Sequence, residues 1–563
     1  MSESTIRASS VTSPSCNKLG TPVEIQNPDT IPIIFIPGIM GSNVRTKKTK
    51  NSVWKLGNLL GQFSKLADQC LKTPAQLETE LNPLTTEVDP SQSIKVTSKL
   101  KLTEKALRKR GWGTVDSGSY GDILTYLQDK LNDIYLEERD SVSAKYGRLN
   151  SFTEVSEWSH LLNTDEVKNW GAASSLQPIT ASEIEHLKKF HFPVYAKGYN
   201  WLQSNEDGAQ NIAKELDKIK KEWGDKFHKF IIVTHSMGGL LTRRLVQLRE
   251  ADIAGVVHGV MPAEGASLAY RRIVSGCGDA GLIPSIVMGP HTEHTTAVIA
   301  NSPGSLELLP TPRYNQGKPW LFLKGKDSNQ NNYTVTLPKQ DPYSEIYKSD
   351  RVWWEMVKED FIDPAKIVKL EVGQQLKDIY FRKIDLVKGF HTKIADHYHP
   401  CSYVHYGHDK KNKSFECLTW TLSQPVKGLN EMQLQYLPPA NAQQHATNLN
   451  KKSEAILDSF EQHKKLPSLT DIDVGKENDG TRYIALSNGE LAHFSISSSD
   501  SFGDGTVPHV SANAPQGKKG VQQVFRIEGF DHQHSYNNTH VRRSVLYSIV
   551  KIIHTNNIQP KHR

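Results

Sequence analysis

The sequence predicts an α/β fold built around a mostly parallel sheet. Short apolar runs rich in β-branched residues are typical of strands that are buried on both faces. Between these runs, apolar residues recur at spacings of three and four, which is typical of helices that bury one face. Strands that alternate with helices in this way argue for the α/β class. The predicted strands are residues 31–36, 192–199, 229–234, 253–261, 320–324 and 521–527, and the predicted helices are 209–223, the stretch after 238 and 541–553.

Two long polar regions interrupt the alternation. Residues from about 51 to 150 and from about 330 to 500 are polar and partly helical, so we expect insertions that cover the core as a cap or lid. The domain that carries these insertions is expected to extend over residues 31–563. Residues 1–30 are rich in Ser, Thr and Pro, a composition that predicts a mobile N-terminal tail.

The composition narrows the range of partners. Among 563 residues, 68 Lys and Arg stand against 61 Asp and Glu, which gives a mild net charge of +7. This excess is too small to indicate nucleic-acid binding, although it favours contact with anionic membrane surfaces. We find no apolar run long enough to span a bilayer and no apolar signal segment, so we expect synthesis in the cytoplasm without a signal peptide. Five scattered cysteines predict reduced thiols.

The stretch THSMG at residues 234–238 nearly fits the G-x-S-x-G pattern of a nucleophile elbow. This sharp turn between a strand and a helix needs small residues two before and two after the serine. Gly238 meets that need, whereas Thr234 is β-branched and departs from it. An apolar run precedes Ser236 and a helical stretch follows it, so we predict that Ser236 is a nucleophile. The alternative is a serine that only caps the helix.

A serine nucleophile of this kind requires an acid and then a histidine further along the chain. Asp504 lies in SFGDGTVPHV, on a Gly-flanked turn suited to presenting a carboxylate, with an ordinary Asp–Gly reverse turn as the alternative. His532 and His534 follow a predicted strand, and we expect one of them to be the general base that Asp504 orients.

Stabilisation of an oxyanion requires two N–H donors close to the nucleophile. The N–H of Met237, the residue after the serine, is expected to be one of them. The Gly-rich loop FIPGIMGSN at residues 35–43 is expected to supply the other from Ile39 or Met40, unless it is a turn without chemical role. Together, the elbow, this loop, the acid and the histidine predict an α/β-hydrolase fold with large inserted cap regions.

These motifs form a series that resembles a known family. The series is IFIPGIMGSNV (34–44), VW (53–54), GYNW (198–201), THSMGG (234–239), FGDGTV (502–507) and GFDH (529–532). It resembles the lecithin:cholesterol acyltransferase-like hydrolases and, in part, the GPI-inositol-deacylase-like lipases. The resemblance implies that His532, which closes a Gly-x-x-His tetrad, is the base, with His534 as the lesser alternative. It also implies that Ile39 is the second oxyanion donor. Thr234 and the absence of paired cysteines depart from the family pattern.

Three further blocks narrow the resemblance. Residues 261–276, 300–321 and 337–347 are similar to antibacterial phospholipase effectors of bacterial type VI secretion. This resemblance implies a membrane phospholipid as substrate and delivery by the type VI system into the periplasm of a target cell. It implies secretion spike proteins and a cognate immunity protein as partners.

A lipase needs a route from the bilayer to its cleft. Residues 54–67 place Trp54, Leu59, Leu60 and Phe63 at roughly helical spacing between lysines, which is typical of an interfacial helix or lid. A helix packed on the core is an equal alternative. The apolar stretch 281–289 is a second lid candidate.

The histidine-rich stretch 391–408 has the composition of a zinc site but matches no structural zinc spacing, so we expect neither a metal nor a cofactor. The sequence therefore predicts a serine-triad ester hydrolase, specifically an A-type phospholipase acting on membrane glycerophospholipids. A triacylglycerol lipase or lipid acyltransferase with the same triad is one alternative. A hydrolase-fold binding protein without turnover is an alternative of another class.

Overall fold

The computed structural model describes most of the chain, and all structural statements below concern these residues. They are residues 7–8, 23–24, 29–55, 72–97, 100, 102–134, 157–162, 164–172, 176–277, 289, 291–441, 443–444, 480–486 and 491–561. Within them, no helix is long and apolar enough to cross a membrane.

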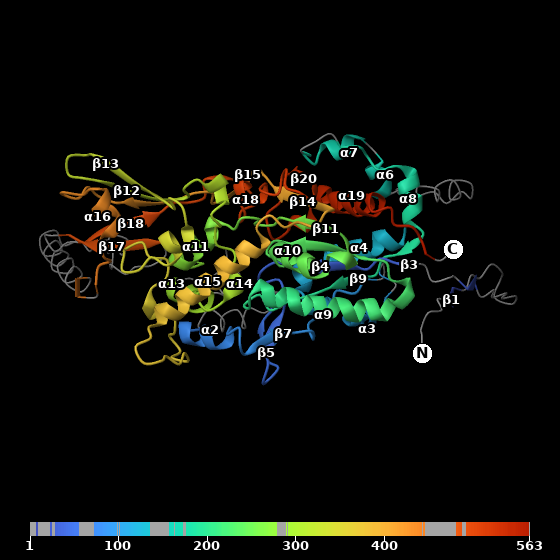
Figure 1. The fold of residues 1–563 in the computed structure, drawn as a ribbon, viewed down its shortest axis with the longest axis horizontal. Coiled ribbons are helices and arrows are strands. Elements are labelled where there is room, and N and C mark those ends of the chain that lie inside the picture. The colour runs from blue at the N-terminus through green and yellow to red at the C-terminus, as the bar shows by residue number, and fades with distance from the viewer. Residues whose placement is uncertain are drawn as a thin grey trace, which may run out of the picture.

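A six-stranded parallel sheet forms the centre of the molecule, in the order β20-β14-β11-β10-β4-β9. Its inner strands are buried along their whole length because helices cover both faces of the sheet. Figure 1 shows this sheet among its helices in the right half of the view. The strands are β4 (Ile33–Ile36), β9 (Val194–Ala196), β10 (Phe230–His235), β11 (Ile253–Gly259), β14 (Ser402–Gly407) and β20 (Val521–Ile527).

Alternate side chains of each strand pack into two different apolar clusters, one on each face of the sheet. Ile33 and Phe35 of β4 face the cluster that α4 and α19 complete, whereas Ile34 and Ile36 face the cluster that α9 and α10 complete. Successive side chains of a strand point to opposite faces, so one apolar run supplies both clusters. The helices are α4 (Ser117–Asn132), α9 (Asn205–Trp223), α10 (Gly238–Arg249) and α19 (Thr539–Thr555).

A second sheet of five strands, in the order β13-β12-β16-β18-β17, lies at the left end of Figure 1. Strands β12 and β16 pair in parallel, and the other neighbours are antiparallel. Trp353 and Phe494 stack at its core with ring centroids 3.6 Å apart. We call this sheet and the helices between it and the central sheet the cap. Its elements are α11 (Ser267–Ser275), α13 (Thr292–Ile299), α14 (Pro303–Leu306), β12 (Leu321–Lys326), β13 (Asn332–Leu337), α15 (Leu376–Ile394), β16 (Leu418–Leu422), α16 (Glu431–Tyr436), β17 (Thr481–Ala485) and β18 (Leu491–Ile496).

Smaller elements surround these two sheets. A three-stranded sheet, β6-β5-β7, follows directly after β4 and is antiparallel. A two-stranded sheet joins β15 to β19. The remaining elements are β1 (Arg7–Ala8), β2 (Val23–Glu24), β3 (Asp29–Thr30), β5 (Val44–Thr46), β6 (Ser52–Trp54), α2 (Pro74–Glu80), β7 (Thr86–Val88), α3 (Glu104–Lys109), α6 (Glu157–Leu161), α7 (Thr164–Lys168), α8 (Ala181–Leu187), β8 (Phe190–His191), β15 (Asp409–Ser414), β19 (Ser501–Gly503) and α18 (His509–Ala512).

The expected insertions contain parts of the central domain. Strand β14 lies within the region 330–500 but pairs between β11 and β20, and α4 lies within 51–150 but packs on the central sheet. The run at 320–324 forms β12 of the cap rather than a strand of the central sheet. Strand β14 escapes sequence analysis because the buried residues Ser402 and His405 interrupt its apolar pattern. Of the expected tail, Asp29 and Thr30 are buried in β3 beside β8.

Candidate active site

Ser236 occupies a tight turn between β10 and α10. Its φ of +51° lies in the left-handed region, which costs a non-glycine residue about 1 kcal/mol or more. Gly238 makes this turn possible, because a Cβ there would lie 2.4 Å from the carbonyl oxygen of Pro37. Thr234 is accommodated in the buried end of β10, where Tyr536 donates a hydrogen bond to its carbonyl oxygen at 2.5 Å. The strand, the strained serine and the helix form the elbow that the sequence predicts.

Three polar side chains form a hydrogen-bonded chain at this elbow. His532 Nε2 lies 2.9 Å from Ser236 Oγ, and His532 Nδ1 lies 2.8 Å from Asp504 Oδ2. Asp504 and Ser236 are almost fully buried, and the side chain of His532 retains about a tenth of its exposure. The structure thus brings together residues that are separated by up to 296 positions in the sequence.

The surroundings of Asp504 determine where the proton of His532 lies. Asp504 Oδ1 accepts hydrogen bonds from the N–H groups of Thr506 and Val507, at 3.0 and 2.8 Å. An aspartate carboxylate only accepts hydrogen bonds. Nδ1 of His532 therefore donates to Asp504, and Nε2 is left to accept the proton of Ser236.

The Gly-rich loop after β4 lies against the nucleophile. A Cβ on Gly38 would lie 2.9 Å from the Cβ of Ser236, so only glycine allows this approach. Ile39 follows Gly38 directly, and Met237 begins α10 as its N-cap. In the described part of the chain, neither the N–H of Ile39 nor that of Met237 donates a hydrogen bond to the backbone or to a side chain. Two free N–H groups thus flank Ser236.

Tyr120 and His235 connect this loop to the triad, although sequence analysis did not single them out. His235 Nε2 lies 2.9 Å from the carbonyl oxygen of His532, which can only accept, so His235 donates from Nε2. Burial lowers the pKa of His235 to about 3, so its Nδ1 is an acceptor and takes a hydrogen bond from Tyr120 at 3.0 Å. The hydroxyl of Tyr120 in turn accepts from the N–H of Gly38 at 3.2 Å. The only signal in the sequence is that His235 is adjacent to Ser236.

Ser414, at the end of β15, is a second residue that the sequence did not reveal. Its Oγ accepts a hydrogen bond from the N–H of Gly505 and donates one to the carbonyl oxygen of Val507, both at 3.1 Å. These bonds close the turn that carries Asp504. Nothing in the stretch HDKKNKS marks this serine, because its role depends on the pairing of β15 with β19.

The other predicted site residues lie apart from this centre. The side chain of His534 is 60% exposed and contacts Asp531, so only His532 reaches the serine. Trp54 belongs to β6 rather than to an interfacial helix, and it is buried with its Nε1 donating to the carbonyl oxygen of Met40 at 2.7 Å. Leu59, Leu60 and Phe63 lie outside the described residues, as does nearly all of the stretch 281–289.

The histidines of the stretch 391–408 do not converge. Across the described ranges, no group of three or more His, Cys, Asp or Glu side chains is arranged to hold a metal ion. His391, for example, is buried and bonded to Tyr343 and to the carbonyl oxygen of Glu307.

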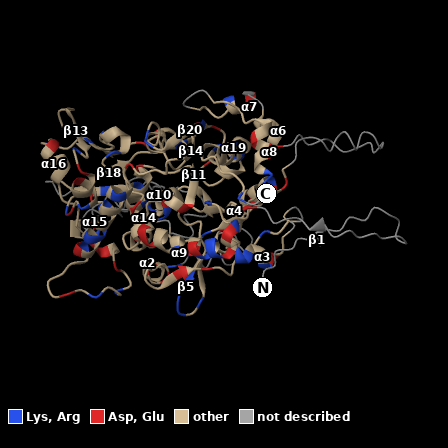
Figure 2. Ribbon diagram, turned by 45° about the vertical axis from the view of Figure 1, so that its right-hand side comes forward, with Lys and Arg blue, Asp and Glu red and all other residues tan. Residues whose placement is uncertain are grey.

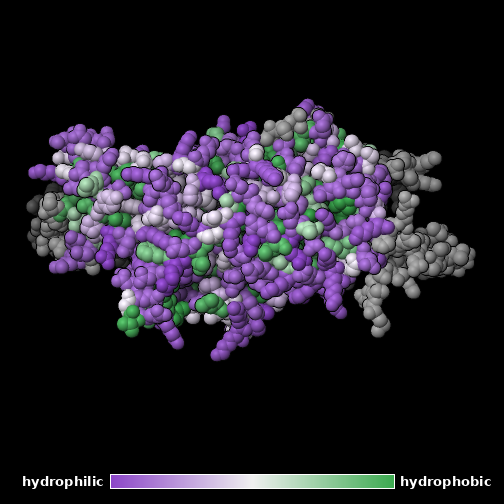
Figure 3. Space-filling model, in the orientation of Figure 1, coloured by the Kyte–Doolittle hydropathy of each residue, from purple (hydrophilic) through white to green (hydrophobic). Residues whose placement is uncertain are grey.

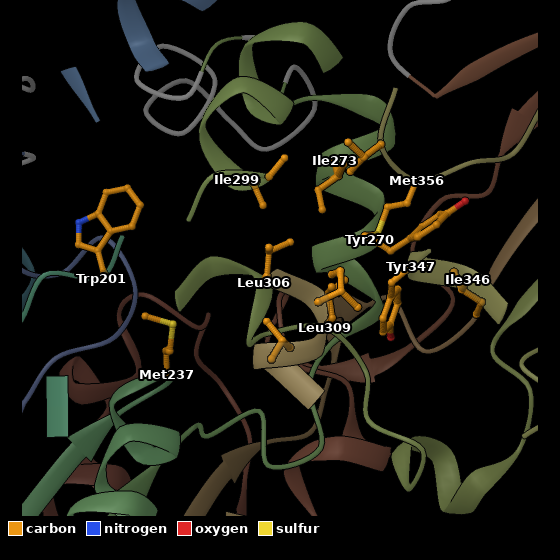
Figure 4. Packing of buried hydrophobic residues seen from close by; sticks show 14 of the residues in the cluster. Trp201, Met237, Tyr270, Ile273, Ile299, Leu306, Leu309, Ile346, Tyr347 and Met356 are labelled. Atoms are coloured by element: carbon orange, nitrogen blue, oxygen red, sulfur yellow. The ribbon is translucent and has the colours of Figure 1, made fainter. Parts of the chain in front are cut away.

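A body of apolar side chains extends from the elbow into the cap. Met237 is fully buried and belongs to the same cluster as residues of α11, α13 and α14. Figure 4 shows Met237 and Trp201 on one side of this cluster and Tyr270, Tyr347 and Met356 on the other, with leucine and isoleucine side chains between them. Apolar surroundings therefore begin at the residue next to the nucleophile.

Glu307 is a buried carboxyl group where α14 ends against the start of α9. It accepts hydrogen bonds from Ser204 at 2.6 Å and from both nitrogens of Asn205 at 2.7 and 2.8 Å. Desolvation outweighs these bonds and raises its pKa to about 7. The joint between the cap and the central domain therefore contains a group that titrates near neutral pH.

A parallel sheet with helices on both faces and a serine elbow after one of its central strands defines the class: the fold is that of the α/β hydrolases. A chain in the crystal structure of the Tle4–Tli4 complex is similar over 94% of this chain and 99% of its own, with a TM-score of 0.71 and 28% sequence identity. Phospholipase PlaB from Legionella pneumophila aligns over 65% of this chain and 63% of its own. Its identity of 10% and TM-score of 0.17 support no inference. No family model matches the sequence, and no curated protein matches it significantly.

Proposed function

We propose that this protein is a serine esterase that cleaves acyl esters of membrane glycerophospholipids, as an A-type phospholipase. The observation that carries the proposal is the hydrogen-bonded chain from Ser236 through His532 to Asp504. A buried serine on a strained turn, bonded to an imidazole that a carboxylate orients, is the arrangement that activates a hydroxyl for attack on an ester.

The first half of the reaction acylates the serine. Ser236 Oγ attacks the ester carbonyl carbon while His532 Nε2 takes the hydroxyl proton. The N–H groups of Ile39 and Met237 hold the resulting oxyanion, and the ionised Asp504 stabilises the imidazolium. Collapse of the intermediate breaks the bond to the alcohol oxygen, which leaves as the lysophospholipid with the proton from His532.

The second half regenerates the enzyme. A water molecule gives a proton to His532 and attacks the acyl carbon, and the same donors hold the second oxyanion. Cleavage of the bond to Ser236 Oγ then releases the fatty acid, and His532 returns the proton to the serine. The products are one fatty acid and one lysophospholipid for each water consumed.

The surroundings of the triad support a lipid substrate. The apolar cluster that begins at Met237, next to the nucleophile, leads away from it into the cap, and apolar side chains are the kind that line acyl-chain sites. The motif series and the blocks at 261–276, 300–321 and 337–347 resemble lipid-acting hydrolases and type VI phospholipase effectors. Fold alone does not fix a substrate, so the proposal rests on both observations.

The likeness to the Tle4–Tli4 structure suggests a protein partner. Tle4 was crystallised in complex with Tli4, and the similarity extends over nearly the whole of this chain. We extend this to a cognate immunity protein that binds the present chain, with type VI spike proteins carrying it into the periplasm of a target cell. We also propose that residues 31–563 form a single domain with its cap insertions.

The decisive experiment follows lipid products by mass spectrometry after vesicles of bacterial phospholipids are mixed with the protein. Ser236→Ala and His532→Ala should each reduce turnover by roughly 10³-fold or more, whereas His534→Ala, the matched control, should leave it unchanged. The position of the acyl chain that remains on the lysophospholipid identifies the ester that is cut.

Three results would contradict the proposal. Equal release of fatty acid by the parent and Ser236→Ala would remove the serine from the mechanism. Formation of lysophospholipid only in the presence of an added acceptor alcohol, with an acyl ester of that alcohol in place of free fatty acid, would instead identify an acyltransferase. A parent protein that reacts with no ester, and whose Ser236 is not labelled by a phosphonate probe, would be a binding protein.

A further inference from the structure

Three exposed elements project from one side of the molecule. The first is the loop of residues 364–375 between a short 3₁₀ helix (Glu359–Phe361) and α15. The second is the turn of residues 47–51 that joins β5 to β6, and the third is the turn of residues 82–85 beside it. Figures 1 and 2 are related by a rotation about the vertical axis, and in both the loop and the β5–β6 turn point downward from the lower edge. We call these three elements together the basal edge.

The loop of the basal edge presents aliphatic side chains to solvent. Val372 is completely exposed, and Ile367 and Leu370 are exposed by 43% and 45%. In Figure 3 the tip of this loop forms a hydrophobic projection at the lower left of a largely hydrophilic surface. Leu84 of the neighbouring turn is exposed by 79%. Exposed aliphatic side chains gathered on projecting elements mark a surface that contacts an apolar partner.

The loop is held in shape by its own hydrogen bonds, so this exposure is part of a defined structure. The carboxylate of Asp363 accepts the N–H groups of Ile367 and Val368 at 2.8 and 3.1 Å. The base of the loop is attached to α2, where Glu78 accepts the N–H of Ala365 at 2.8 Å. Because the loop is already ordered, it loses little further conformational entropy when it contacts an apolar partner.

Lysines surround the aliphatic tips. Lys366 and Lys369 are exposed within the loop, where Glu371 is the single exposed acidic residue. The β5–β6 turn exposes Lys47, Lys48 and Lys50, of which Lys50 is paired with Glu87 at 2.8 Å, and lysine colours its tip blue in Figure 2, below the β5 label. Lys47 donates to the carbonyl oxygen of Leu84 at 2.7 Å, which joins the two turns. Aliphatic tips with lysines behind them match the apolar interior and anionic headgroups of a bilayer.

The basal edge is connected directly to the site. Strand β5 begins directly after the Gly-rich loop of residues 35–43, whose Gly38 lies against Ser236. Strand β6 follows the β5–β6 turn and carries Trp54, whose indole N–H donates a hydrogen bond to the carbonyl oxygen of Met40. A membrane that holds the β5–β6 turn therefore holds the Gly-rich loop of residues 35–43 at a fixed distance from the lipid surface.

We propose that the basal edge docks this protein on an anionic phospholipid bilayer, with Ile367, Leu370, Val372 and Leu84 inserted among the acyl chains and the lysines at the headgroups. This docking proposal rests on the proposed function in one respect: the proposed function explains why the protein meets a membrane. Docking itself needs no hydrolysis. The docking proposal assigns membrane contact to a cap loop and a basic turn, separate from the candidate stretch 54–67.

The test measures flotation of the Ser236→Ala protein with vesicles, so that no lipid is consumed. Vesicles of phosphatidylcholine with phosphatidylglycerol should carry the protein, and vesicles of phosphatidylcholine alone should carry much less. The triple variant I367S/L370S/V372S should lower binding on the order of 100-fold. The matched variant L248S/M432S/Y436S removes three exposed apolar side chains from α10 and α16 and should bind like the parent.

The charge is tested separately. K47S/K48S should weaken binding to the anionic vesicles and reduce its dependence on salt, whereas K188S/K189S, which removes two exposed lysines from the end of α8, should not. Equal binding by the two apolar triple variants, or no binding of the parent to anionic vesicles, would overturn the proposal. Hydrolysis of a soluble short-chain ester by proteins that retain Ser236 separates the two proposals, because it depends on the triad and not on the basal edge.

Discussion

Strands β4, β10, β11 and β14 of the central sheet are buried at every residue, whereas β12 and β16 of the cap sheet alternate between buried and accessible residues. A sheet covered on both faces leaves its strand ends and connecting loops as the place for polar chemistry. The elbow follows β10, the Gly-rich loop of residues 35–43 begins in β4, and the loop of His532 follows β20 at the edge of the sheet. The cap sheet carries none of them and instead contributes apolar packing. The two sheets therefore have different roles: the central sheet positions the candidate active site, and the cap sheet packs beside it.

The division is tested most strongly at the acid. Asp504→Asn should reduce kcat by about 10⁴-fold, because the amide cannot hold the tautomer of His532 that accepts the serine proton. Thermal unfolding should show a nearly unchanged Tm, which separates lost chemistry from lost structure. Asp531→Asn, next to the triad histidine in sequence but exposed, is the control and should retain activity.

The cap sheet should respond in the opposite way. Trp353→Ala removes a fully buried indole that stacks on Phe494 and donates to the carbonyl oxygen of Leu434 at 2.8 Å. We expect the free energy of unfolding to fall by about 3–5 kcal/mol. Turnover of a soluble ester per folded molecule should change little. Trp353→Phe, which keeps a ring in the stack, should cost less. A large loss of turnover without a loss of stability would place the chemistry partly in the cap.

The joint between the two parts should depend on pH through Glu307. Its pKa is about 7 in the folded protein, above the value of 4.5 for an exposed glutamate, so the folded state holds the proton more tightly. Stability is therefore fully present below about pH 4.5 and falls by up to about 3 kcal/mol as the pH rises towards and past 7.

Denaturant unfolding at several pH values checks this dependence. Glu307→Gln should remove the slope between pH 5 and 7. Glu206, also on α9, is the control: it is partly buried, but hydrogen bonds led by that from Arg244 lower its pKa to about 2. Glu206→Gln should shift stability by the same amount across this range. An identical slope in the parent and Glu307→Gln would show that Glu307 does not titrate there.

The smallest effect is expected at the contact between α4 and the Gly-rich loop of residues 35–43. Tyr120→Phe leaves the N–H of Gly38 and Nδ1 of His235 without a partner, and we expect kcat to fall about tenfold with KM little changed. Tyr126→Phe makes the same chemical change on the same helix, where the hydroxyl contacts Glu157 at 3.4 Å, and should have no such effect. A change in KM alone would assign Tyr120 to substrate binding.

Sequence patterns predicted the central sheet better than the cap, for a physical reason. Strands buried on both faces, such as β10 and β11, appear as continuous apolar runs that a single sequence reveals. Strands β13, β17 and β18 mix polar and apolar residues in short segments and were not predicted. Strand β14 was missed because its buried histidine and serine depend on neighbours that only the sheet supplies.

The candidate site shows the same limit. Ser236, Asp504 and His532 lie in local motifs that the sequence displays, and the structure places them within hydrogen-bond distance. Tyr120 and Ser414 act across 115 and 91 positions of the chain, so no local pattern marks them. The fold class was predicted correctly and is confirmed by the likeness to a solved structure over 94% of the chain. The roles of the site residues stay predictions.

The separation of Ser236 from His532 by 296 positions also imposes a delay during synthesis of the chain. At roughly 5–20 residues per second, a ribosome needs on the order of 15–60 seconds to pass from the nucleophile to the base. During that interval the elbow has neither its imidazole nor strand β20, which forms the edge of the central sheet just before His532. A nascent chain therefore cannot assemble the hydrogen-bonded chain of Ser236, His532 and Asp504 until its last portion has emerged. Under the proposed function, this delay keeps unfinished molecules from hydrolysing the lipids of the cell that makes them.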